Sequence, residues 1–410
     1  MNSNLQPVPK DGGASKSHMN IVGIIAEYNP FHYGHAFHLA QARRITGASH
    51  VIVVMSGNYV QRGVPAMFDK YTRAQAALHN GADLVLELPP CTATGSAEYF
   101  AKGAVRLLAG TGIVTDLCFG SECGDAAVLE RPARILSEEP EAYRTLLKEY
   151  LRMGKPYPEA RMLALHLYDP ALPADVLKSP NNLLGIEYLK ALYRLDIPLR
   201  AHTIPRAGAS YHDLQMEQAA FASAGGIRQA FLESRGSMTS GIRAQLPSSE
   251  LYLPYDGKIP VTEDAFSLLL LDRLIQNPGE DLSLYFDVTA ELANRIRKYT
   301  DAFMSFSQFT DLLKTRNLTR TSVSRALLHI LLGIRKYETV NVLRVLGFRK
   351  EAASLLQKMT LHGRMPLVTA CPDAALPEHW LYADRLYAHV RSMLHGHAFQ
   401  NECRRKMLVL

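Results

Sequence analysis

Short apolar runs and amphipathic stretches alternate along residues 20–121 of the chain. The apolar runs include NIVGIIA, HVIVVMSG, DLVLELP and DLCFGSE, and the stretches between them, such as AFHLAQARRIT and SAEYFAKGAVRLLAGTG, carry helical spacing. Strands separated by helical segments of about 10 to 15 residues are typical of βαβ units with a parallel sheet. The alternation therefore predicts a doubly wound α/β domain, whose ligands bind outside the carboxyl ends of the strands.

The pattern changes beyond about residue 130. EAYRTLLKEYLRMG and NLLGIEYLKALYRL have helical spacing, LRAHTIPR is one more strand candidate, and the segments after residue 215, such as DAFSLLLLDRLIQ and VSRALLHILLGIRK, are almost all helical. We therefore expect a doubly wound parallel-sheet α/β domain over residues 19–215 and a mainly α-helical domain over residues 216–410. Residues 1–18 are polar, rich in Gly, Ser and Pro, and precede a second methionine, Met19. We expect a disordered extension there, and a start upstream of the true one fits equally.

Composition and charge exclude several classes of protein. The chain has no run of 18 or more apolar residues and no apolar stretch in its first 18 residues, which predicts a cytoplasmic protein without a membrane span. Its five cysteines form no C-x-x-C pair, which argues against a disulfide framework and a zinc site. The formal net charge is +6, but residues 295–350 alone hold 12 Lys and Arg against 3 Asp and Glu. This uneven distribution predicts that one part of the surface binds a polyanion.

The sequence EYNPFHYGH, residues 27–35, follows the first predicted strand and opens the first predicted helix. Free N–H groups and the helix dipole favour an anion at such a position. His32 and His35 can donate hydrogen bonds to phosphate oxygens there, and Gly34 lets a nucleotide lie against the backbone. The motif differs from the phosphate-binding G-x-x-x-x-G-K-[ST] and from the dinucleotide-binding G-x-G-x-x-G. A histidine pair suits charge stabilisation at an α-phosphate from which pyrophosphate is displaced; the structural alternative is a helix cap or a satisfied core histidine.

Several longer motifs follow in a characteristic order. IIAEYNPFHYGH resembles the H-x-G-H motif of the nucleotidyltransferase superfamily, and MSGNYVQRGVPAMFDKYTRAQAAL, GADLVLELP, FGSE, SPNNLLGIEYLKAL and IPRAGASYHD resemble the tRNA(Met) cytidine acetate ligase family. The resemblance runs from about residue 20 to the C-terminal helices and is strongest before residue 215. It implies a two-step reaction, in which acetate attacks the α-phosphate of ATP to give acetyl-adenylate and pyrophosphate. The N4 amine of the wobble cytidine in elongator tRNA(Met) then attacks the acetyl carbon to give N4-acetylcytidine.

The same resemblance implies the residues of the ATP site. His32 and His35 would be catalytic and contact the phosphates, Gly120 of FGSE would let the backbone approach the nucleotide, Asn182 of SPNN would hydrogen-bond it, and Arg206 of IPRAG would meet the phosphates. The stretch that lines ATP would comprise Ile25, Ala26, Glu27, Tyr28, Asn29, Pro30, Phe31, His32, Tyr33, Gly34, His35, Ala36, Phe37 and His38. Tyr33 departs from the family, which commonly has Asn there, so the implied packing between the histidines does not carry over.

Other polar residues have both a functional and a structural interpretation. Gln61 and Arg62 follow the second predicted strand at its carboxyl end and could face a substrate, although SGN could equally be a plain turn. Asp69 opens a helix and is most simply its N-cap, with Lys70 and Arg73 on a solvated face.

The basic segment supplies candidate RNA contacts. NRIRKYT, KTRNLTRTSVSR and GIRKYE interleave Arg and Lys with Thr, Ser and Tyr, which suits phosphate contacts along an anticodon arm. Arg316, Arg320 and Arg325 are the candidates, with a solvated helix face as the alternative. The target base must leave its stack and enter the α/β pocket while the helical domain holds the stem and loop. We expect tRNA and acetate as partners, with no membrane and no DNA.

Two further functions stay open at this point. A small-molecule nucleotidyltransferase of cofactor synthesis would attack the same α-phosphate within the same fold, although it has no need of a basic helical half. A non-catalytic tRNA-binding protein would keep the fold without the reaction, and the intact H-x-G-H argues against it. Magnesium is expected together with ATP, although no carboxylate cluster in the sequence identifies a protein site for a metal.

Overall fold

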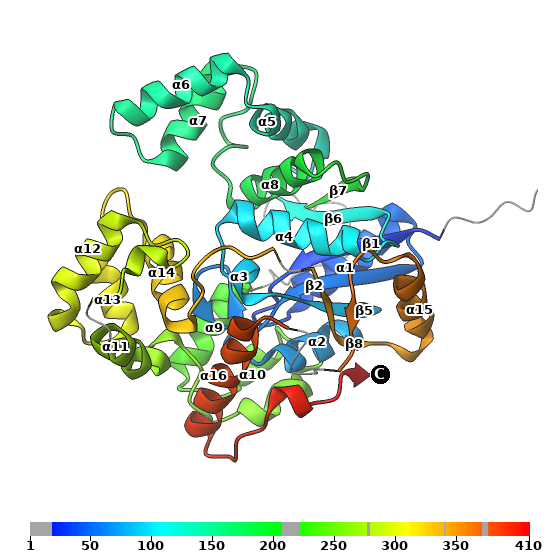
Figure 1. Ribbon diagram of the computed structural model, residues 1–410. Helices are drawn as coiled ribbons and strands as arrows, with labels where there is room; N and C mark the ends of the chain where they lie inside the picture. The colour runs from blue at the N-terminus through cyan, green and yellow to red at the C-terminus, as the bar shows by residue number, and fades with distance from the viewer. Residues whose placement is uncertain (1–18, 207–221, 277–278, 340, 371–375) are drawn as a thin grey trace, which may run out of the picture.

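The computed structural model describes residues 19–206, 222–276, 279–339, 341–370 and 376–410 (Figure 1). The strands are β1 (Ile21–Ala26), β2 (His50–Ser56), β3 (Tyr59–Val60), β4 (Val64–Pro65), β5 (Leu84–Leu88), β6 (Asp116–Ser121), β7 (Arg200–Pro205), β8 (Leu343–Phe348), β9 (Leu367–Val368) and β10 (Leu408–Val409). The helices up to β7 are α1 (Tyr33–Thr46), α2 (Lys70–His79), α3 (Pro90–Ala93), α4 (Ala97–Gly110), α5 (Ala126–Glu138), α6 (Glu141–Arg152), α7 (Tyr157–Tyr168) and α8 (Pro180–Arg194).

The helices after β7 include six short 3₁₀ segments. The α-helices are α9 (Ala224–Glu233), α10 (Ser240–Arg243), α11 (Ser267–Gln276), α12 (Ala290–Tyr299), α13 (Phe306–Leu313), α14 (Arg320–Leu332), α15 (Ala353–His362) and α16 (Glu378–His395). The 3₁₀ segments are η1 (Ser249–Tyr255), η2 (Glu263–Phe266), η3 (Leu282–Leu284), η4 (Thr300–Ala302), η5 (Lys350–Ala352) and η6 (Glu402–Arg404).

A single eight-stranded sheet organises the α/β part. Its strand order is β10-β8-β5-β2-β1-β6-β7, with β9 paired to β8, and a separate pair, β3 and β4, forms a small hairpin. Strands β5, β2, β1, β6 and β7 are mutually parallel, as predicted, and β1 lies between β2 and β6. The strand order therefore reverses at β1, and a ligand site is expected outside the carboxyl ends of β1 and β6.

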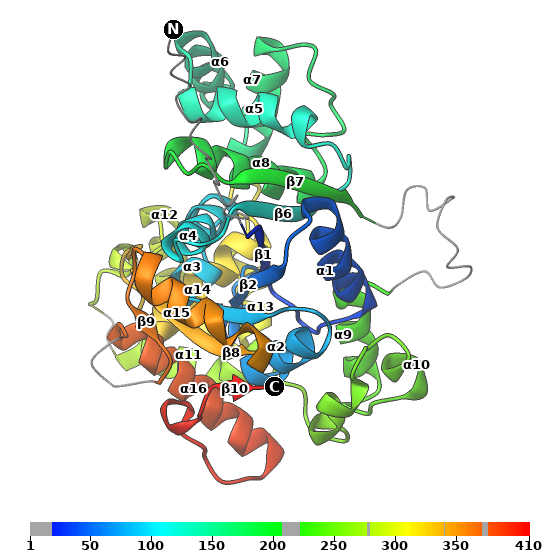
Figure 2. The same ribbon diagram turned by 90° about the vertical axis from the view of Figure 1, so that its right-hand side faces the viewer.

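Both faces of the sheet are covered, which explains why its strands read as continuous apolar runs. Successive residues of β2 point to opposite faces: Ile52 and Val54 belong to the core under α4 and α8, whereas Val51 and Val53 belong to the core under α1 and α2. Figures 1 and 2 show these helices on the two sides of the sheet. The carboxyl ends of the parallel strands are consequently the part of the sheet left for a ligand.

The C-terminal part is mainly helical, as predicted, but it also returns to the sheet. Helices α11 to α14 and α16 share a separate hydrophobic core. Strand β8 pairs antiparallel with β5, and β9 and β10 pair with β8, so the prediction that strands almost end at residue 215 was wrong for these three. The expected boundary between residues 215 and 216 and the expected extension over residues 1–18 lie outside the described residues. No helix in the described ranges has the length and apolar character needed to cross a lipid bilayer.

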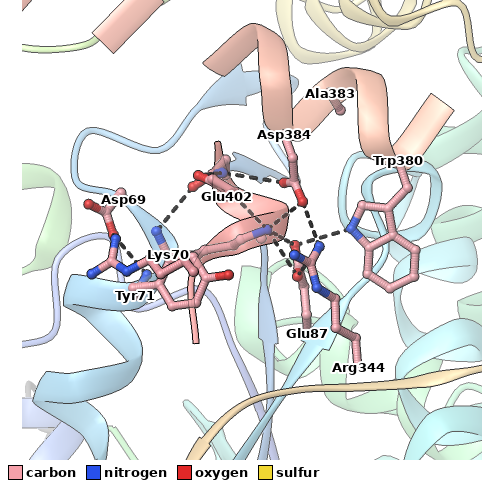
Figure 3. A network of polar contacts seen from close by, with 12 residues as sticks. Asp69, Lys70, Tyr71, Glu87, Arg344, Trp380, Ala383, Asp384 and Glu402 are labelled. Atoms are coloured by element: carbon pink, nitrogen blue, oxygen red, sulfur yellow. Dashed lines mark hydrogen bonds and ion pairs between the residues drawn. The ribbon is translucent and has the colours of Figure 1, made fainter. Parts of the chain in front are cut away.

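A network of buried charges joins this C-terminal part to the sheet (Figure 3). The Nζ atom of Lys70, on α2, lies 2.9 Å from Glu87 Oε1 on β5, 2.6 Å from Asp384 Oδ2 on α16 and 2.9 Å from Glu402 Oε2 on η6. Arg344 on β8 completes the network, with Nη1 3.0 Å from Glu87 Oε2. All five side chains are buried. The placement of Lys70 on a solvated face was therefore wrong, because its acidic partners are supplied by distant parts of the chain.

Candidate active site

The turn between β1 and α1 is held in place by the core behind it. Tyr28 and Phe31 are fully buried, and Tyr28 has a left-handed backbone with φ of 51°. The N–H of Phe31 donates to Tyr252 Oη (3.2 Å), and the side chain of Asn29 accepts from the N–H of Met67 (3.0 Å). The buried part of the turn therefore acts as a support that fixes the path of the backbone towards His32.

His32 and His35 form a reciprocal cap at the start of α1. His32 Nδ1 accepts from the N–H of Gly34 (3.0 Å), and His35 Nδ1 accepts from the N–H of His32 (3.2 Å). The two rings stack with centroids 3.8 Å apart and planes 27° apart. Since each Nδ1 accepts, the ring proton of each neutral imidazole lies on Nε2. The cap thus leaves two Nε2–H donors at a helix N-terminus, where an anion is already favoured.

The histidines of this turn are neutral at physiological pH. Burial, reinforced by the positive charge of Arg206, lowers the pKa of His32 to about 4. The same two causes lower the pKa of His38, on the next turn of α1, to about 4, and the pKa of His35 falls well below its usual value. Neutral rings still donate through Nε2–H. A bound phosphate would oppose the burial effect and raise these pKa values, so phosphate and ring proton stabilise each other.

The opposite wall comes from β6, β7 and α8. Asn182, near the start of α8, accepts through Oδ1 from the N–H groups of Glu122 (2.9 Å) and Cys123 (3.1 Å), which fixes the loop after β6. Arg206 follows β7, and its Nη1 donates to Asn181 Oδ1 (2.9 Å). A Cβ atom at Gly120 would lie 3.3 Å from Arg206 Cγ, so a larger residue there would press on the arginine.

The structure thus brings the residues expected in the ATP site to the carboxyl ends of β1, β6 and β7. In the stretch 25–38, residues 28–31 are buried, whereas Gly34 to His38 are partly accessible. The side-chain oxygen of Asn182 already accepts hydrogen bonds from two backbone N–H groups. Its direct hydrogen bond to a nucleotide stays a prediction, and its observed contacts make it a positioning residue for the β6 loop.

Arg73 is a residue whose importance the sequence analysis missed. Its guanidinium is fully buried and donates to the carbonyl oxygens of Glu27 (2.6 Å), Ser56 (3.1 Å), Phe68 (2.9 Å) and Gly57. Its predicted solvated position was wrong, whereas the prediction of an N-cap at the start of α2 is confirmed. Arg73 joins the ends of β1 and β2 below the histidine turn. Helical spacing gave no signal for it, because its partners are backbone oxygens.

Arg228, on α9, also approaches the histidine turn from the C-terminal part. Its Nη1 donates to the carbonyl oxygen of Asn29 (2.6 Å), and burial lowers its pKa. Beside it, Glu27 Oε1 accepts from the N–H of Gln61 (2.8 Å), which fixes the turn of the β3–β4 hairpin against the end of β1. Arg62 is exposed, and its charge further lowers the pKa of Arg228. These cations add positive potential at the carboxyl ends of the strands.

The three candidate RNA contacts differ in accessibility. Arg316 is exposed, and Arg320 is exposed but lies 3.5 Å from Asp311. Arg325 has a side chain only 13% exposed, and its Nε donates to Asp287 Oδ2 (3.0 Å). Arg316 is therefore accessible to a ligand. Arg320 forms an ion pair at the surface, and Arg325 forms one that is largely buried.

Comparison with known proteins gives a consistent family. A profile described as HIGH nucleotidyl transferase matches residues 19–402. A tRNA(Met) cytidine acetate ligase from Halothermothrix orenii is 40% identical over 370 residues, covering 86% of this chain and 87% of the relative. Another, from Acetivibrio thermocellus, is 37% identical and covers 87% of this chain and 89% of the relative.

Solved structures agree with this assignment. The crystal structure of Thermotoga maritima TmcAL bound with alpha-thio ATP superposes with a TM-score of 0.84 at 29% identity, covering 96% of this chain and 100% of that one. The apo structure of the same protein gives a TM-score of 0.84 at 30% identity over the same shares of the two chains. The chain therefore belongs to the HIGH nucleotidyl transferase family and, within it, to the tRNA(Met) cytidine acetate ligases.

Proposed function

We propose that this protein joins acetate to the wobble cytidine of elongator tRNA(Met) at the expense of ATP. An acetate oxygen attacks the α-phosphorus and the bond to the bridging oxygen of pyrophosphate breaks, giving acetyl-adenylate. The N4 amine of cytidine then attacks the acetyl carbon, loses a proton and expels AMP, giving N4-acetylcytidine. The observation that carries the proposal is the pair of Nε2–H donors of His32 and His35 at the N-terminus of α1, in the electrostatic field of Arg206.

Each part of the site has a role in the first step. Negative charge grows on the α-phosphate and on the leaving pyrophosphate, and preorganised donors stabilise such charge in the transition state. The two imidazoles would supply these donors without a net charge of their own, and the dipole of α1 would add to their effect. Arg206 would supply the positive charge, and Gly120 would leave room beside it for the nucleotide.

Magnesium accompanies ATP in this proposal. Among the residues that the structure describes, no group of three or more His, Cys, Asp or Glu is placed to hold a metal ion. Mg²⁺ commonly keeps several waters and binds substrate phosphates.

The second step requires the target cytidine to leave the anticodon stack. We propose that the C-terminal helices, residues 216–410, hold the anticodon arm while the base enters the ATP domain, residues 19–215, where acetyl-adenylate waits. ATP, acetate and tRNA are all present in the cytoplasm, so we place the reaction there.

Substitution of the histidines tests the proposal. We expect His32→Ala and His35→Ala each to reduce acetate-dependent ATP–pyrophosphate exchange by about 10²- to 10³-fold, because each removes one donor to the transition state. The affinity for tRNA should stay unchanged. The control is His79→Ala, an exposed histidine in the last turn of α2.

Nucleoside analysis completes the test. Labelled acetate, ATP, magnesium and bulk tRNA should yield labelled N4-acetylcytidine with the parent protein and far less with either histidine variant. Equal yield from variant and parent would contradict the role of the histidines. Pyrophosphate release with phosphorylated metabolites but not with acetate would indicate the small-molecule transferase instead.

A further inference from the structure

The connection between β6 and β7 is much longer than the sheet requires. A crossover between parallel strands needs about a dozen residues, usually one helix. Here residues 122–199 contain four helices, α5 to α8. Helix α8 packs against α4 and α5, beside the sheet, whereas α6 packs mainly on α7. Figures 1 and 2 show the α6–α7 hairpin standing away from the sheet. The hairpin is therefore not needed to complete the crossover.

The outer face of α6 carries a line of cations. Arg144, Lys148 and Arg152 are spaced four residues apart, so they lie on one side of the helix, and all three are exposed. Neither Lys148 nor Arg152 forms an ion pair with any described residue. Arg144 pairs with Glu141, but both side chains are more than half exposed, and such a pair contributes little. Tyr157, at the start of α7, is 54% exposed. The hairpin thus offers positive charge along one helix and an accessible aromatic ring.

The hairpin is tied to the wall of the candidate active site. Arg161 on α7 lies 2.6 Å from Glu187 on α8, and the arginine side chain is only 18% exposed. The first turn of α8 carries Asn181 and Asn182, which hold Arg206 and the loop after β6. In Figure 1, α6 and α7 lie above and α12 to α14 below, on the side of the sheet where α3 follows the carboxyl end of β5. Two groups of helices therefore flank the end of the sheet that carries the site.

We propose that the α6 face, defined as Arg144, Lys148 and Arg152 together with Tyr157, is a second contact surface for the tRNA backbone. The inference rests on the proposed function, because it takes tRNA as the substrate. Cations four residues apart on a helix advance by roughly 6 Å per step, which is comparable with the spacing of successive phosphates along a strand. Exposed cations and an exposed aromatic ring on one hairpin match the chemistry of single-stranded or looped RNA. A protein partner would instead favour an apolar centre with few charges.

Neutralising the α6 face tests this proposal. The variant Arg144→Gln/Lys148→Gln/Arg152→Gln removes three positive charges and keeps residues of good helix propensity. Its matched control, Arg44→Gln/Lys350→Gln/Arg364→Gln, removes the same charge at the opposite end of the sheet: Arg44 is in the last turn of α1, Lys350 follows β8, and the N–H of Arg364 donates to Gly110 at the end of α4. The affinity of purified full-length protein for tRNA is measured between about 50 and 200 mM salt.

We expect the α6 variant to bind tRNA at least tenfold more weakly at the lowest salt concentration. Each lost phosphate contact should reduce the slope of log K against log salt by about 0.7 to 0.9, or about 2 to 3 in all. Acetate-dependent ATP–pyrophosphate exchange, which needs no tRNA, should be unchanged in this variant and serves as the measure of folding. The control variant should keep both the exchange rate and most of the slope. Lys148→Gln alone should show one third of the change, and it decides the matter if the triple variant does not fold.

Three outcomes would overturn the inference. An unchanged slope with intact exchange would remove α6 from the RNA surface. An equal loss in the two triple variants would assign the effect to net charge. A concentration-dependent dimer that Tyr157→Gln dissociates would assign the face to a protein contact. Failure of the parent protein to catalyse exchange would contradict the proposed function instead, and it would leave the salt slope as a separate result.

Discussion

His32 and His35 each use Nδ1 to cap α1, so the helix start determines which nitrogen carries the ring proton. A histidine whose folded pKa lies below its usual value of about 6.5 favours the fold above that pH, and this stabilisation is lost as the pH falls through the folded pKa. The pKa of His32 is about 4. These rings should therefore stay neutral, with the Nε2–H tautomer, throughout the range in which enzymes are usually assayed.

Nitrogen NMR of labelled histidines checks this prediction. In the free protein we expect no titration of His32 or His38 between pH 6 and 8. Addition of ATP should raise the pKa of His32, because the phosphate charge favours the imidazolium. A titration of His32 near pH 6.5 in the free protein, or an Nδ1–H tautomer, would contradict the arrangement of donors proposed for the reaction.

At the scale of single residues, the sequence predicts those whose role follows from local geometry. The histidine pair needed only a strand before it and a helix after it. Lys70, Arg73 and Arg228 could not be recognised, because a cation is assigned to the surface unless its partner is visible. Lys70 meets Glu402, more than 300 positions away, and Arg73 meets backbone oxygens that carry no sequence signal.

At the scale of elements, α14 explains why the basic segment is not a uniform RNA surface. The N-terminal half of α14 packs against the β3–β4 hairpin: a Cβ at Gly63 would lie 2.4 Å from the backbone nitrogen of Arg325, and Ser324 Oγ donates to the carbonyl oxygen of Gly63 (2.9 Å). Arg325 therefore serves this contact between elements. The exposed cations without an ion pair in the described part of the segment 295–339 are Arg297, Lys298, Arg316 and Lys336. Of these, Arg297 donates a hydrogen bond to the carbonyl oxygen of Glu280 (2.9 Å).

This difference predicts a separation of two effects. We expect Lys298→Gln/Arg316→Gln/Lys336→Gln to weaken tRNA binding and to reduce its salt slope by about 2 to 3, with little change in melting temperature. Arg325→Gln should lower the melting temperature by a few degrees, because it leaves Asp287 without its partner, and should keep the salt slope. Salt titration and thermal unfolding of both variants check this. If Arg325→Gln alone reduced the salt slope of tRNA binding, Arg325 would belong to the RNA-binding surface.

The order of the elements could be predicted where strands and helices alternate. The prediction failed where a single strand follows a long helical stretch. The run LRVLGF of β8 follows more than a hundred residues of helical pattern, and a six-residue apolar run there is equally compatible with a buried helix turn. Its partner is β5, more than 250 positions earlier, and the pairing is antiparallel. Only the tertiary contact decides that the segment is a strand.

At the scale of the whole molecule, buried charges fix the C-terminal segments onto the α/β part. Glu87, Asp384 and Glu402 provide three negative charges for the two positive charges of Lys70 and Arg344 (Figure 3). Such a network is costly to assemble, but removing one member leaves an uncompensated charge. Burial raises the pKa of Glu402 to about 7, and the charge of Asp384 adds to this shift, whereas Lys70 opposes it.

This raised pKa makes the free energy of unfolding depend on pH in a defined direction. A carboxyl whose folded pKa exceeds its ordinary value of about 4.5 binds its proton more tightly in the fold, so its stabilisation is complete below pH 4.5 and is lost as the pH rises to about 7. Glu402→Gln keeps a neutral side chain at every pH. The stability of the parent relative to this variant should therefore fall by about 2 kcal/mol between pH 5 and pH 8, with most of the change below pH 7.

Urea unfolding of both proteins at several pH values measures the difference. Taking the difference is essential, because the histidines with lowered pKa values act in the opposite direction and are common to both proteins. At pH 5 the two proteins should differ least in net charge, since Glu402 is then protonated. Parallel stability curves would mean that Glu402 is ionised in the folded protein throughout, and that Lys70 and Arg344 together compensate all three carboxylates.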